Sequence, residues 1–366
     1  MRTALLPNVS LKLMTHPRAE SESAFAATDD LTWAAARPCP YTTLADSAPL
    51  SLAWLESVRR FEQLRSGLLD PPLPANVVTV AVSGSLSRME ADADSDLDLL
   101  IVVDDRQNSA DLPAIFNHVW QRLDQANLQP AVVKPKPGGI FSSCVSWRKV
   151  IDRDRRGIID DDLTVFGQRM QLLMDAQPLI RPNGFAEVQR SILQWYQEDR
   201  IRCLFAESNP FHWLWQDVQR YWRSLRSRAC WLSADDAAVS LEVNFKLRFS
   251  RLVLMAALLA AVARCPDDES TQAKQPSASI RYLQQCLTQT PLERLSAFGS
   301  TRQGDDSPKV SSSAERLIQL YQQAWTRSRI LRKQPALFSD EDRDLLHELN
   351  SVVRRIAATD SEMWWF

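Results

Sequence analysis

Two aspartates one residue apart, Asp96 and Asp98, are the residues of this sequence best suited to do chemistry. They stand at the start of the apolar run 97–103, which has the composition of a β-strand. Because residues two apart in a strand point to the same face, the two carboxylates are expected to lie side by side. Such a pair suits Mg²⁺, which takes one or two protein carboxylates and leaves its other positions to water and substrate phosphates. The pair therefore predicts a magnesium site for a phosphate-bearing substrate.

A tight turn, Gly84-Ser85, ends the preceding apolar run at 77–83. Glycine has no Cβ, so the backbone at Gly84 can approach a phosphate closely. Ser85 offers a hydroxyl and a backbone N–H to the same oxygens. The turn is thus predicted to hold the phosphates while the aspartates hold the metal.

The order of these residues resembles the signature of the nucleotidyltransferase superfamily related to DNA polymerase β. That signature is an apolar strand, Gly-Ser or Gly-Gly, a short gap, and then Asp-apolar-Asp-apolar. Here ten residues separate Gly84-Ser85 from the run Asp96-Leu97-Asp98-Leu99. Arg88 and Ser95 also match positions that many members fill with Arg and Ser. The resemblance covers roughly residues 77–104.

The resemblance implies transfer of a nucleoside monophosphate from a nucleoside triphosphate, such as ATP, to a hydroxyl, phosphate or amine. It implies two Mg²⁺ or Mn²⁺ ions bound by three acidic residues, two of them Asp96 and Asp98. Gly84, Ser85 and Arg88 would bind the nucleotide. A plainer alternative is that the aspartates only solvate a hairpin turn, but such a turn needs no Gly-Ser at the end of the preceding strand.

The third carboxylate that the resemblance requires is not obvious. Candidates are Asp152, Asp154 and the run 160–162, and Asp160 is favoured because residues 157–159 read as a short strand leading into it. A helix N-cap before Leu163 explains the same run equally well, since Asp is favoured at that position. Without a third acid, the chain would bind a metal–nucleotide and transfer nothing, as a regulatory or scaffold protein. Both alternatives stay open.

Basic residues in the second half of the chain are candidates for binding the triphosphate. Arg220 and Arg223 are three apart on one helical face, as are Arg248 and Arg251, and Lys246 lies near the second pair. Such groups neutralise phosphates and stabilise a pyrophosphate leaving group, and the resembling proteins often use a helical partner domain in that way. An alternative also stays open, because arginines on amphipathic helices commonly cover apolar surface and pair with acids.

The composition of the chain indicates which classes of substrate and which kinds of site are expected. A formal net charge of −2 gives no general attraction to nucleic acid, so a small or protein substrate is favoured over a long polynucleotide. Six cysteines are scattered without metal-ligand spacing, and four histidines lack a Ser or Cys partner pattern. The start lacks the apolar core of a signal peptide, and the longest apolar run, 252–263, has only twelve residues. We expect a cytoplasmic protein without a membrane segment.

The pattern along the chain predicts an α+β fold. Residues 1–48 are expected to be a loosely ordered arm, 49–165 a mixed-sheet catalytic domain of nucleotidyltransferase type, and 166–366 an all-helical domain. Within the catalytic domain the predicted elements are helices at 50–69 and 112–126 and strands at 77–83, 97–103 and near 131–133. The region after about residue 167, including 170–179, is expected to be helical almost throughout.

The predicted function is therefore that of a Mg²⁺-dependent nucleotidyltransferase. Its acceptor, a protein, a small molecule or another nucleotide, does not follow from the residues. The alternative is a catalytically inactive, nucleotide-binding regulatory or scaffold protein.

Overall fold

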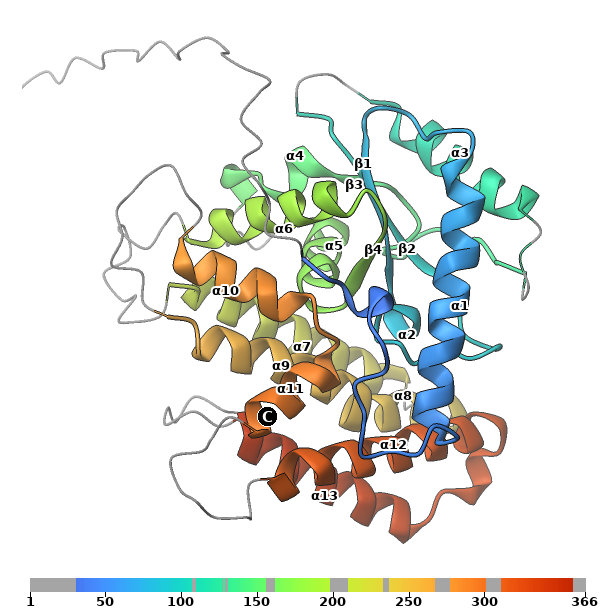
Figure 1. Ribbon diagram of the computed structural model, residues 1–366, viewed down its shortest axis with the longest axis vertical. Helices are drawn as coiled ribbons and strands as arrows, with labels where there is room; N and C mark the ends of the chain where they lie inside the picture. The colour runs from blue at the N-terminus through green and yellow to red at the C-terminus, as the bar shows by residue number, and fades with distance from the viewer. Residues whose placement is uncertain are drawn as a thin grey trace, which may run out of the picture. The chain divides into compact units, whose positions relative to one another are not determined.

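The computed structural model describes residues 31–106, 110–126, 128, 131–155, 162–197, 210–232, 237–266, 277–300 and 311–357. Thr32–Phe366 form one compact unit, and the described part of that unit is an α+β structure (Figure 1). The α+β class predicted from the sequence is confirmed.

The sheet has four strands in the described part of the chain, in the order β3-β2-β1-β4. Their bounds are Val77–Ser83 for β1, Asp98–Val103 for β2, Val145–Ser146 for β3 and Ala176–Ile180 for β4. β1 is antiparallel to both β2 and β4, whereas β3 is parallel to β2, so the sheet is mixed, as predicted. The register places Ser83 opposite both Asp98 and Ala176. One end of the sheet therefore gathers the end of β1 and the starts of β2 and β4.

The two central strands form because their residues can be buried on both faces. All of β1 except Val78, and all of β2 except Asp98, is buried. Valine, isoleucine and leucine dominate both strands, and such branched side chains pack well on a pleated surface. The rigid, dehydrated centre of the sheet thus ends at a polar residue, Asp98.

Two predictions about the strands were wrong. Residues 131–136 have no regular structure, and the strand parallel to β2 is β3. The helix expected through 170–179 ends at Met174, and the chain then enters β4. A short apolar run does not distinguish a buried helix from a strand by its spacing alone. Pro178, which lacks an N–H, is tolerated because β4 is at the edge of the sheet.

Helices α1 to α6 accompany the sheet. Their bounds are Pro49–Leu69, Gly84–Ser87, Leu112–Gln125, Trp147–Val150, Leu163–Met174 and Pro182–Gln197. The helices expected at 50–69 and 112–126 are confirmed. The described residues also form short 3₁₀ turns at Ala34–Ala36, Arg153–Arg155 and Pro335–Leu337.

The rest of the described chain is helical, as predicted. The bounds of α7 to α9 are His212–Leu232, Ala237–Lys246 and Leu252–Ala263, with a π-helix, η4, at Leu247–Arg251 between α8 and α9. The bounds of α10 to α13 are Ala278–Leu287, Pro291–Ser300, Ser311–Lys333 and Asp340–Ala357. Every residue from Leu252 to Val262 is buried, which confirms the apolar run as a core helix. No helix among the described residues has the length and apolarity needed to cross a membrane.

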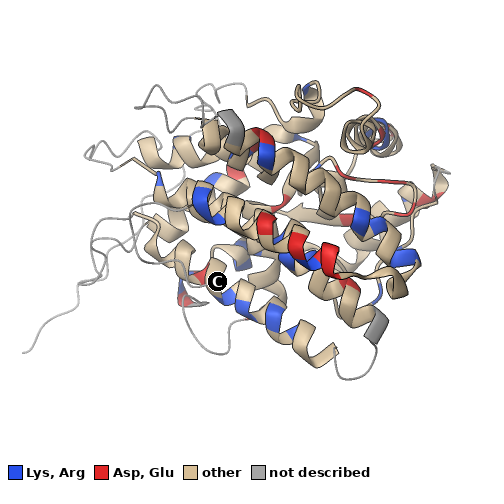
Figure 2. Ribbon diagram, turned by 90° about the horizontal axis from the view of Figure 1, so that it is seen from below, with Lys and Arg blue, Asp and Glu red and all other residues tan. Residues whose placement is uncertain are grey.

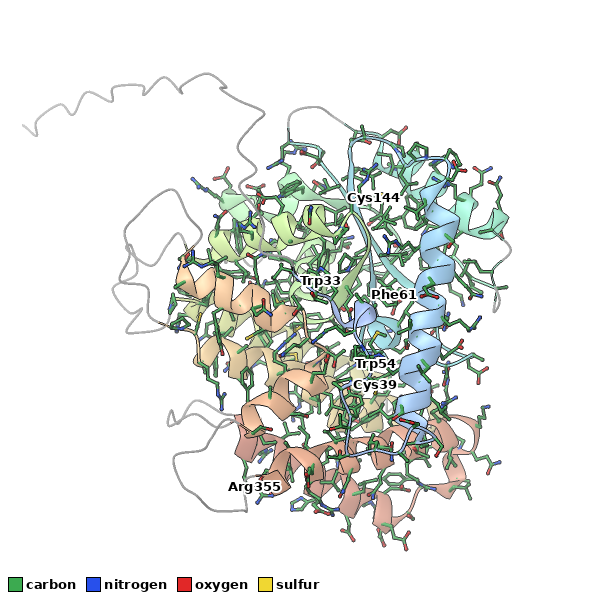
Figure 3. All side chains as sticks on the ribbon, in the orientation of Figure 1. Trp33, Cys39, Trp54, Phe61, Cys144 and Arg355 are labelled. Atoms are coloured by element: carbon green, nitrogen blue, oxygen red, sulfur yellow. The ribbon has the colours of Figure 1, made fainter. Side chains whose placement is uncertain are left out.

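The segment before α1 packs against the core (Figure 3). The ring of Trp33 lies edge-on to Phe185 of α6, with centroids 5.1 Å apart, and Trp54 of α1 meets Tyr41 in the same way at 5.7 Å. Arg37 forms a 3.3 Å ion pair with Glu293 of α11. Residues 33–41 therefore join the sheet region to the helices that follow it in sequence.

Figure 2 shows basic and acidic residues interspersed over the helices.

Candidate active site

The turn after β1 is built around Gly84, whose φ of +72° favours glycine. A Cβ at this position would lie 2.8 Å from Oδ2 of Asp98. The four-residue helix α2 starts here, and the Ser87 hydroxyl donates a 2.8 Å hydrogen bond to the Gly84 carbonyl. A side chain at residue 84 would therefore occupy the space beside the Asp98 carboxylate.

Asp96 and Asp98 flank a buried leucine, as the strand period predicts. Leu97 and Leu99 are buried, Asp98 is half-buried at the first position of β2, and Asp96 is exposed just before it. The structure thus brings the Gly84 turn and the Asp98 carboxylate together at one end of the sheet.

The two carboxylates differ from neighbouring acids in their lack of partners. Within the described ranges, neither Asp96 nor Asp98 accepts a hydrogen bond or forms an ion pair. By contrast, Asp92 pairs with Arg329 of α12 at 2.8 Å, and Asp94 lies 3.4 Å from the ammonium of Lys333. Among the acids of this loop, Asp96 and Asp98 therefore keep carboxylate oxygens that no described side chain occupies.

Burial raises the pKa of Asp98 to about 6, and the negative charges of Asp175 and Asp96 act in the same direction. The positive charges of Arg88 and Arg251 oppose this shift in the pKa. A carboxylate that is costly to ionise in the free protein is stabilised when a cation binds beside it. The site is therefore electrostatically prepared for a cation.

Asp175 is a buried acid at this site that the sequence did not reveal. It immediately precedes β4, and its carboxylate accepts hydrogen bonds from Ser87 Oγ at 2.8 Å and from Arg88 at 2.6 Å. Its backbone carbonyl accepts a 2.7 Å hydrogen bond from Ser83 Oγ. Burial raises the pKa of Asp175, while Arg88 opposes the rise. In the sequence, Asp175 merely follows an apolar run whose spacing predicts a helix, and nothing in that pattern predicts an acid at the site.

Arg88 is fully engaged inside the protein. Besides Asp175 it pairs with Glu90 at 3.0 Å, and Glu90 in turn accepts a hydrogen bond from the hydroxyl of Tyr321 in α12. This buried network fixes α2 relative to β4 and α12.

The donor set fits a hard cation only in part. Carboxylate oxygens are the donors that Mg²⁺ prefers, and Asp96 and Asp98 supply them from a rigid strand end. In the part of the chain that the structure describes, however, no group of three His, Cys, Asp or Glu residues is close enough to hold an ion. Asp160 and Asp161 lie outside the described residues. Asp162 caps α5 by accepting from the amides of Thr164 and Val165, so the N-cap interpretation holds for that member of the run.

The other two candidates for the third acid, Asp152 and Asp154, interact with each other within one loop. The Asp152 carboxylate accepts a 3.0 Å hydrogen bond from the amide of Asp154, which lies in an exposed 3₁₀ turn. Neither is joined to Asp96 or Asp98 by a hydrogen bond among the described residues.

Comparison with known families bears directly on this arrangement. Residues 52–158 match the family described as Putative nucleotidyltransferase DUF294. The matched region contains most of α1, the Gly84 turn, the two aspartates and β1 to β3, and it ends before Asp175 and β4. It supports the nucleotidyltransferase superfamily and nucleotidyl transfer as the general activity. No curated protein and no solved structure matches the chain significantly.

Arg251, at the end of η4, is a cation of the helical region whose charge acts on Asp98. It is half-buried, its charge lowers the pKa of Asp98, and burial lowers its own pKa. Tyr221 of α7 lies in the same electrostatic surroundings and accepts a 2.7 Å hydrogen bond from Gln171. Gln171 in turn accepts a 2.7 Å hydrogen bond from the hydroxyl of Ser83, so side chains connect α7 to the end of β1.

Arg248 and Arg251 do not share a face, although their spacing suggested it. A π-helix has more residues per turn than an α-helix, so residues three apart diverge further around the axis. Arg248 is exposed, whereas Arg251 is half-buried and acts on Asp98. A spacing of three residues predicts a shared face in an α-helix, but these two arginines lie in a π-helix, where that prediction does not hold.

The remaining predicted phosphate ligands have other surroundings. The Arg220 guanidinium lies 3.8 Å from the centre of the Phe166 ring and 3.4 Å from Asp217. Lys246 pairs with Glu242 at 2.6 Å, and Arg223 is exposed on α7. Nucleotide binding by these residues stays a prediction.

Proposed function

We propose that this chain is a metal-dependent nucleotidyltransferase that uses Asp96 and Asp98 to bind Mg²⁺ or Mn²⁺ together with a nucleoside triphosphate such as ATP. The observation that carries the proposal is the contrast between these two unpaired carboxylates and the paired acids around them. The match of residues 52–158 to a nucleotidyltransferase family supports the reaction class.

In this proposal the turn after β1 binds the phosphates. Ser85 supplies its hydroxyl and backbone N–H, and Gly84 keeps the space next to Asp98 open because it has no Cβ. A bound divalent cation supplies charge neutralisation at the phosphates during transfer. Asp96 and Asp98 fix the position of that cation from the end of β2.

Arg251 is the proposed cation for the triphosphate on the helical side. Its guanidinium acts on Asp98 and is partly shielded from water, where charge–charge interactions are stronger. An arginine in such a place stabilises the negative charge that develops on the leaving pyrophosphate. Its contact with nucleotide complements the phosphate binding by Ser85.

Arg88 and Asp175 are positioning residues in this account. Their buried pair fixes α2, and with it the Gly84 turn, against the start of β4. Asp160 remains the proposed third carboxylate on the basis of the sequence alone. The acceptor is a protein, a small molecule or a second nucleotide, because the net charge of −2 gives no drive toward a long nucleic acid.

A second candidate function has one specific observation in its favour. No third acidic ligand joins Asp96 and Asp98 among the described residues. A protein with only two ligands would bind a metal–nucleotide without transferring it, and would act as a regulatory or scaffold protein.

The deciding experiment offers each α-labelled nucleoside triphosphate with Mg²⁺ or Mn²⁺ to the full chain, alone and with a cell extract. The proposal expects label transfer and pyrophosphate release by the wild type, loss of both in Asp96→Asn/Asp98→Asn, and retention in Asp94→Asn, whose carboxylate is exposed and paired with Lys333. Nucleotide binding without turnover under every condition would favour the regulatory function.

A further inference from the structure

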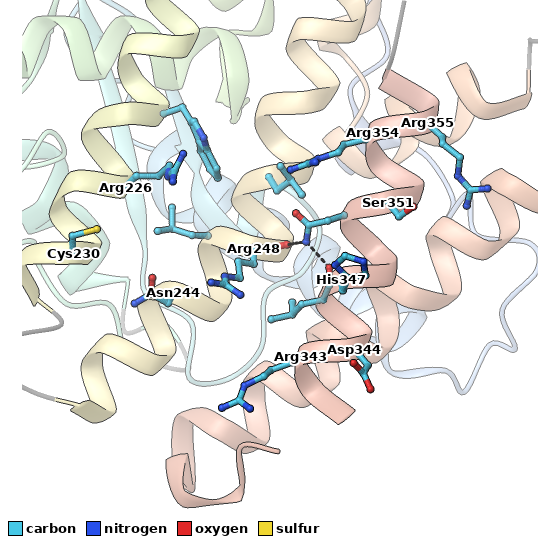
Figure 4. A pocket seen from close by; sticks show the side chains of 15 residues that line it. Arg226, Cys230, Asn244, Arg248, Arg343, Asp344, His347, Ser351, Arg354 and Arg355 are labelled. Carbon is cyan, nitrogen blue, oxygen red and sulfur yellow. Dashed lines mark hydrogen bonds between the residues drawn. The ribbon is translucent and has the colours of Figure 1, made fainter. Parts of the chain in front are cut away.

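A cavity of about 980 Å³ lies in the helical region, between α7, α8, η4, α9 and α13 (Figure 4). Its lining includes none of the residues proposed to bind metal or nucleotide at the sheet, namely Gly84, Ser85, Asp96, Asp98 and Arg251. It is therefore a separate place in the fold, with its own chemistry.

The lining of this cavity is strongly basic. Five arginines contribute to it against one acidic residue, Asp344. The arginines are Arg226 on α7, Arg248 on η4, and Arg343, Arg354 and Arg355 on α13. All five arginines are solvent-exposed, so an anion that enters the cavity from water can contact them.

Two of these guanidinium groups have no acidic partner in the part of the chain that the structure describes. Arg343 pairs with Asp340, but Arg226 and Arg248 form no ion pair within the described ranges. Figure 4 shows Arg226, Arg248 and Arg354 extending toward the space between the helices, whereas Arg355 points away from it. The guanidinium groups of these three arginines therefore face the same cavity from opposite walls.

The wall that carries Arg248 is held in place by α13. Asn350 donates a 3.0 Å hydrogen bond to the backbone carbonyl of Arg248, drawn in Figure 4. Leu247, Leu252 and Leu346 supply an apolar floor. A mainly preformed hollow with an apolar floor and a few convergent charged groups is typical of a small-molecule site, and this volume is in the usual range of roughly 300–1,000 Å³.

We propose that this cavity binds a small ligand that carries two or more phosphate groups, independently of the nucleotide at Asp96 and Asp98. Arginines on facing walls match negative charges spread along a ligand better than one compact anion, and guanidinium groups form strong charge-assisted hydrogen bonds with phosphate. A chain with a net charge of −2 favours such a ligand over a nucleic-acid backbone.

The first test is calorimetry of the full chain with inorganic tripolyphosphate. The protein carries Asp96→Asn/Asp98→Asn, and EDTA is present, so metal–phosphate binding at the sheet does not contribute. We expect saturable binding that Arg226→Gln/Arg248→Gln weakens by about tenfold or more. Arg65→Gln, which removes an exposed arginine of α1, serves as the matched control and should bind like the parent.

The second test uses Cys230, an exposed thiol in the cavity lining, as a reporter. Alkylation by iodoacetamide is followed for each cysteine by peptide mass spectrometry, in the chain with native arginines. Tripolyphosphate should slow modification of Cys230 and leave Cys39 unaffected. Protection of Cys230 tests whether tripolyphosphate binds in the cavity even if the double arginine variant fails to fold.

Three results would overturn the proposal. One is the absence of saturable binding up to about 1 mM tripolyphosphate. Another is equal affinity in the parent and in a folded Arg226→Gln/Arg248→Gln variant. The third is binding of single-stranded RNA that depends on both arginines and that tripolyphosphate does not displace, which would make the cavity part of a nucleic-acid surface.

Discussion

Arg88 donates a 2.6 Å hydrogen bond to the carboxylate of Asp175, and this buried pair joins the residue after α2 to the residue before β4. Glu90 and Tyr321 extend the network to α12. The turn that carries Gly84 is therefore held by residues far apart in the sequence, and its position depends on the helical part of the chain as well as on the sheet.

Removing one partner of this pair should be strongly destabilising, because it leaves a buried charge unpaired. We expect Arg88→Met to lower the free energy of unfolding by about 3–5 kcal/mol, measured by urea denaturation. Arg316→Gln breaks an exposed pair with Glu348 and should stay within about 1 kcal/mol of the wild type. Equal effects of the two substitutions would remove the structural role given to Arg88.

Gly84→Ala should impair the site in two ways, by straining the backbone and by placing a Cβ against the Asp98 carboxylate. The φ of +72° disfavours alanine by about 1–2 kcal/mol, and the new Cβ would lie 2.8 Å from Asp98 Oδ2. We expect weaker Mn²⁺ binding and lower stability. Gly139→Ala is the matched control, since its Cβ meets no atom within 4 Å. Unchanged Mn²⁺ affinity in Gly84→Ala would show that the space beside Asp98 is not used.

The raised pKa of Asp98 predicts a pH-dependent stability. In the folded protein its pKa is about 6 instead of 3.8, so the native state binds more protons between these values. The stability that this group contributes is complete below pH 3.8 and is lost as the pH rises through 6. At pH 7.5 without metal, Asp98→Asn should therefore be more stable than the wild type, by at most about 3 kcal/mol.

Urea unfolding at pH 4 and pH 7.5, in EDTA, checks this sign. Asp98→Asn should show a smaller loss of stability across the interval than the wild type, and Asp94→Asn should behave like the wild type. Parallel pH profiles for all three proteins would contradict the electrostatic account of Asp98.

Arg251 should matter for the nucleotide more than for the fold. Arg251→Gln is expected to lower kcat/KM for the nucleoside triphosphate by about 100–1,000-fold, in the range found when one charge-stabilising donor is removed. Arg223→Gln in the same transfer assay tests one of the two arginines of α7, Arg220 and Arg223, that the sequence predicts as phosphate ligands. A larger effect of Arg223→Gln than of Arg251→Gln would assign the phosphate contact to α7 instead.

The sequence revealed the parts of the site that depend on local rules. Alternate residues of an extended run point to opposite faces, so the burial of Leu97 and Leu99 beside the less buried Asp96 and Asp98 could be predicted without a structure. Gly84 was identifiable because Gly-Ser ends the apolar run 77–83 and glycine lets the backbone approach a ligand closely.

Other parts depend on tertiary structure and could not be predicted. Asp175 reaches the site because β4 returns to pair with β1, which a short apolar run does not specify. The separation of Arg248 from Arg251 arises from a π-turn that no residue pattern announced. The strand expected near 131–133 was wrong because a short apolar stretch forms a strand only where a partner edge is available.

The most direct test of the central claim is electron paramagnetic resonance of Mn²⁺ with the full chain, in the presence of a non-hydrolysable nucleoside triphosphate. We predict that the wild type and Asp94→Asn bind Mn²⁺–nucleotide, and that Asp96→Asn/Asp98→Asn loses this binding by about 100-fold or more while still folding. Unchanged Mn²⁺–nucleotide affinity in the folded double variant would contradict the assignment of these two aspartates as the metal site.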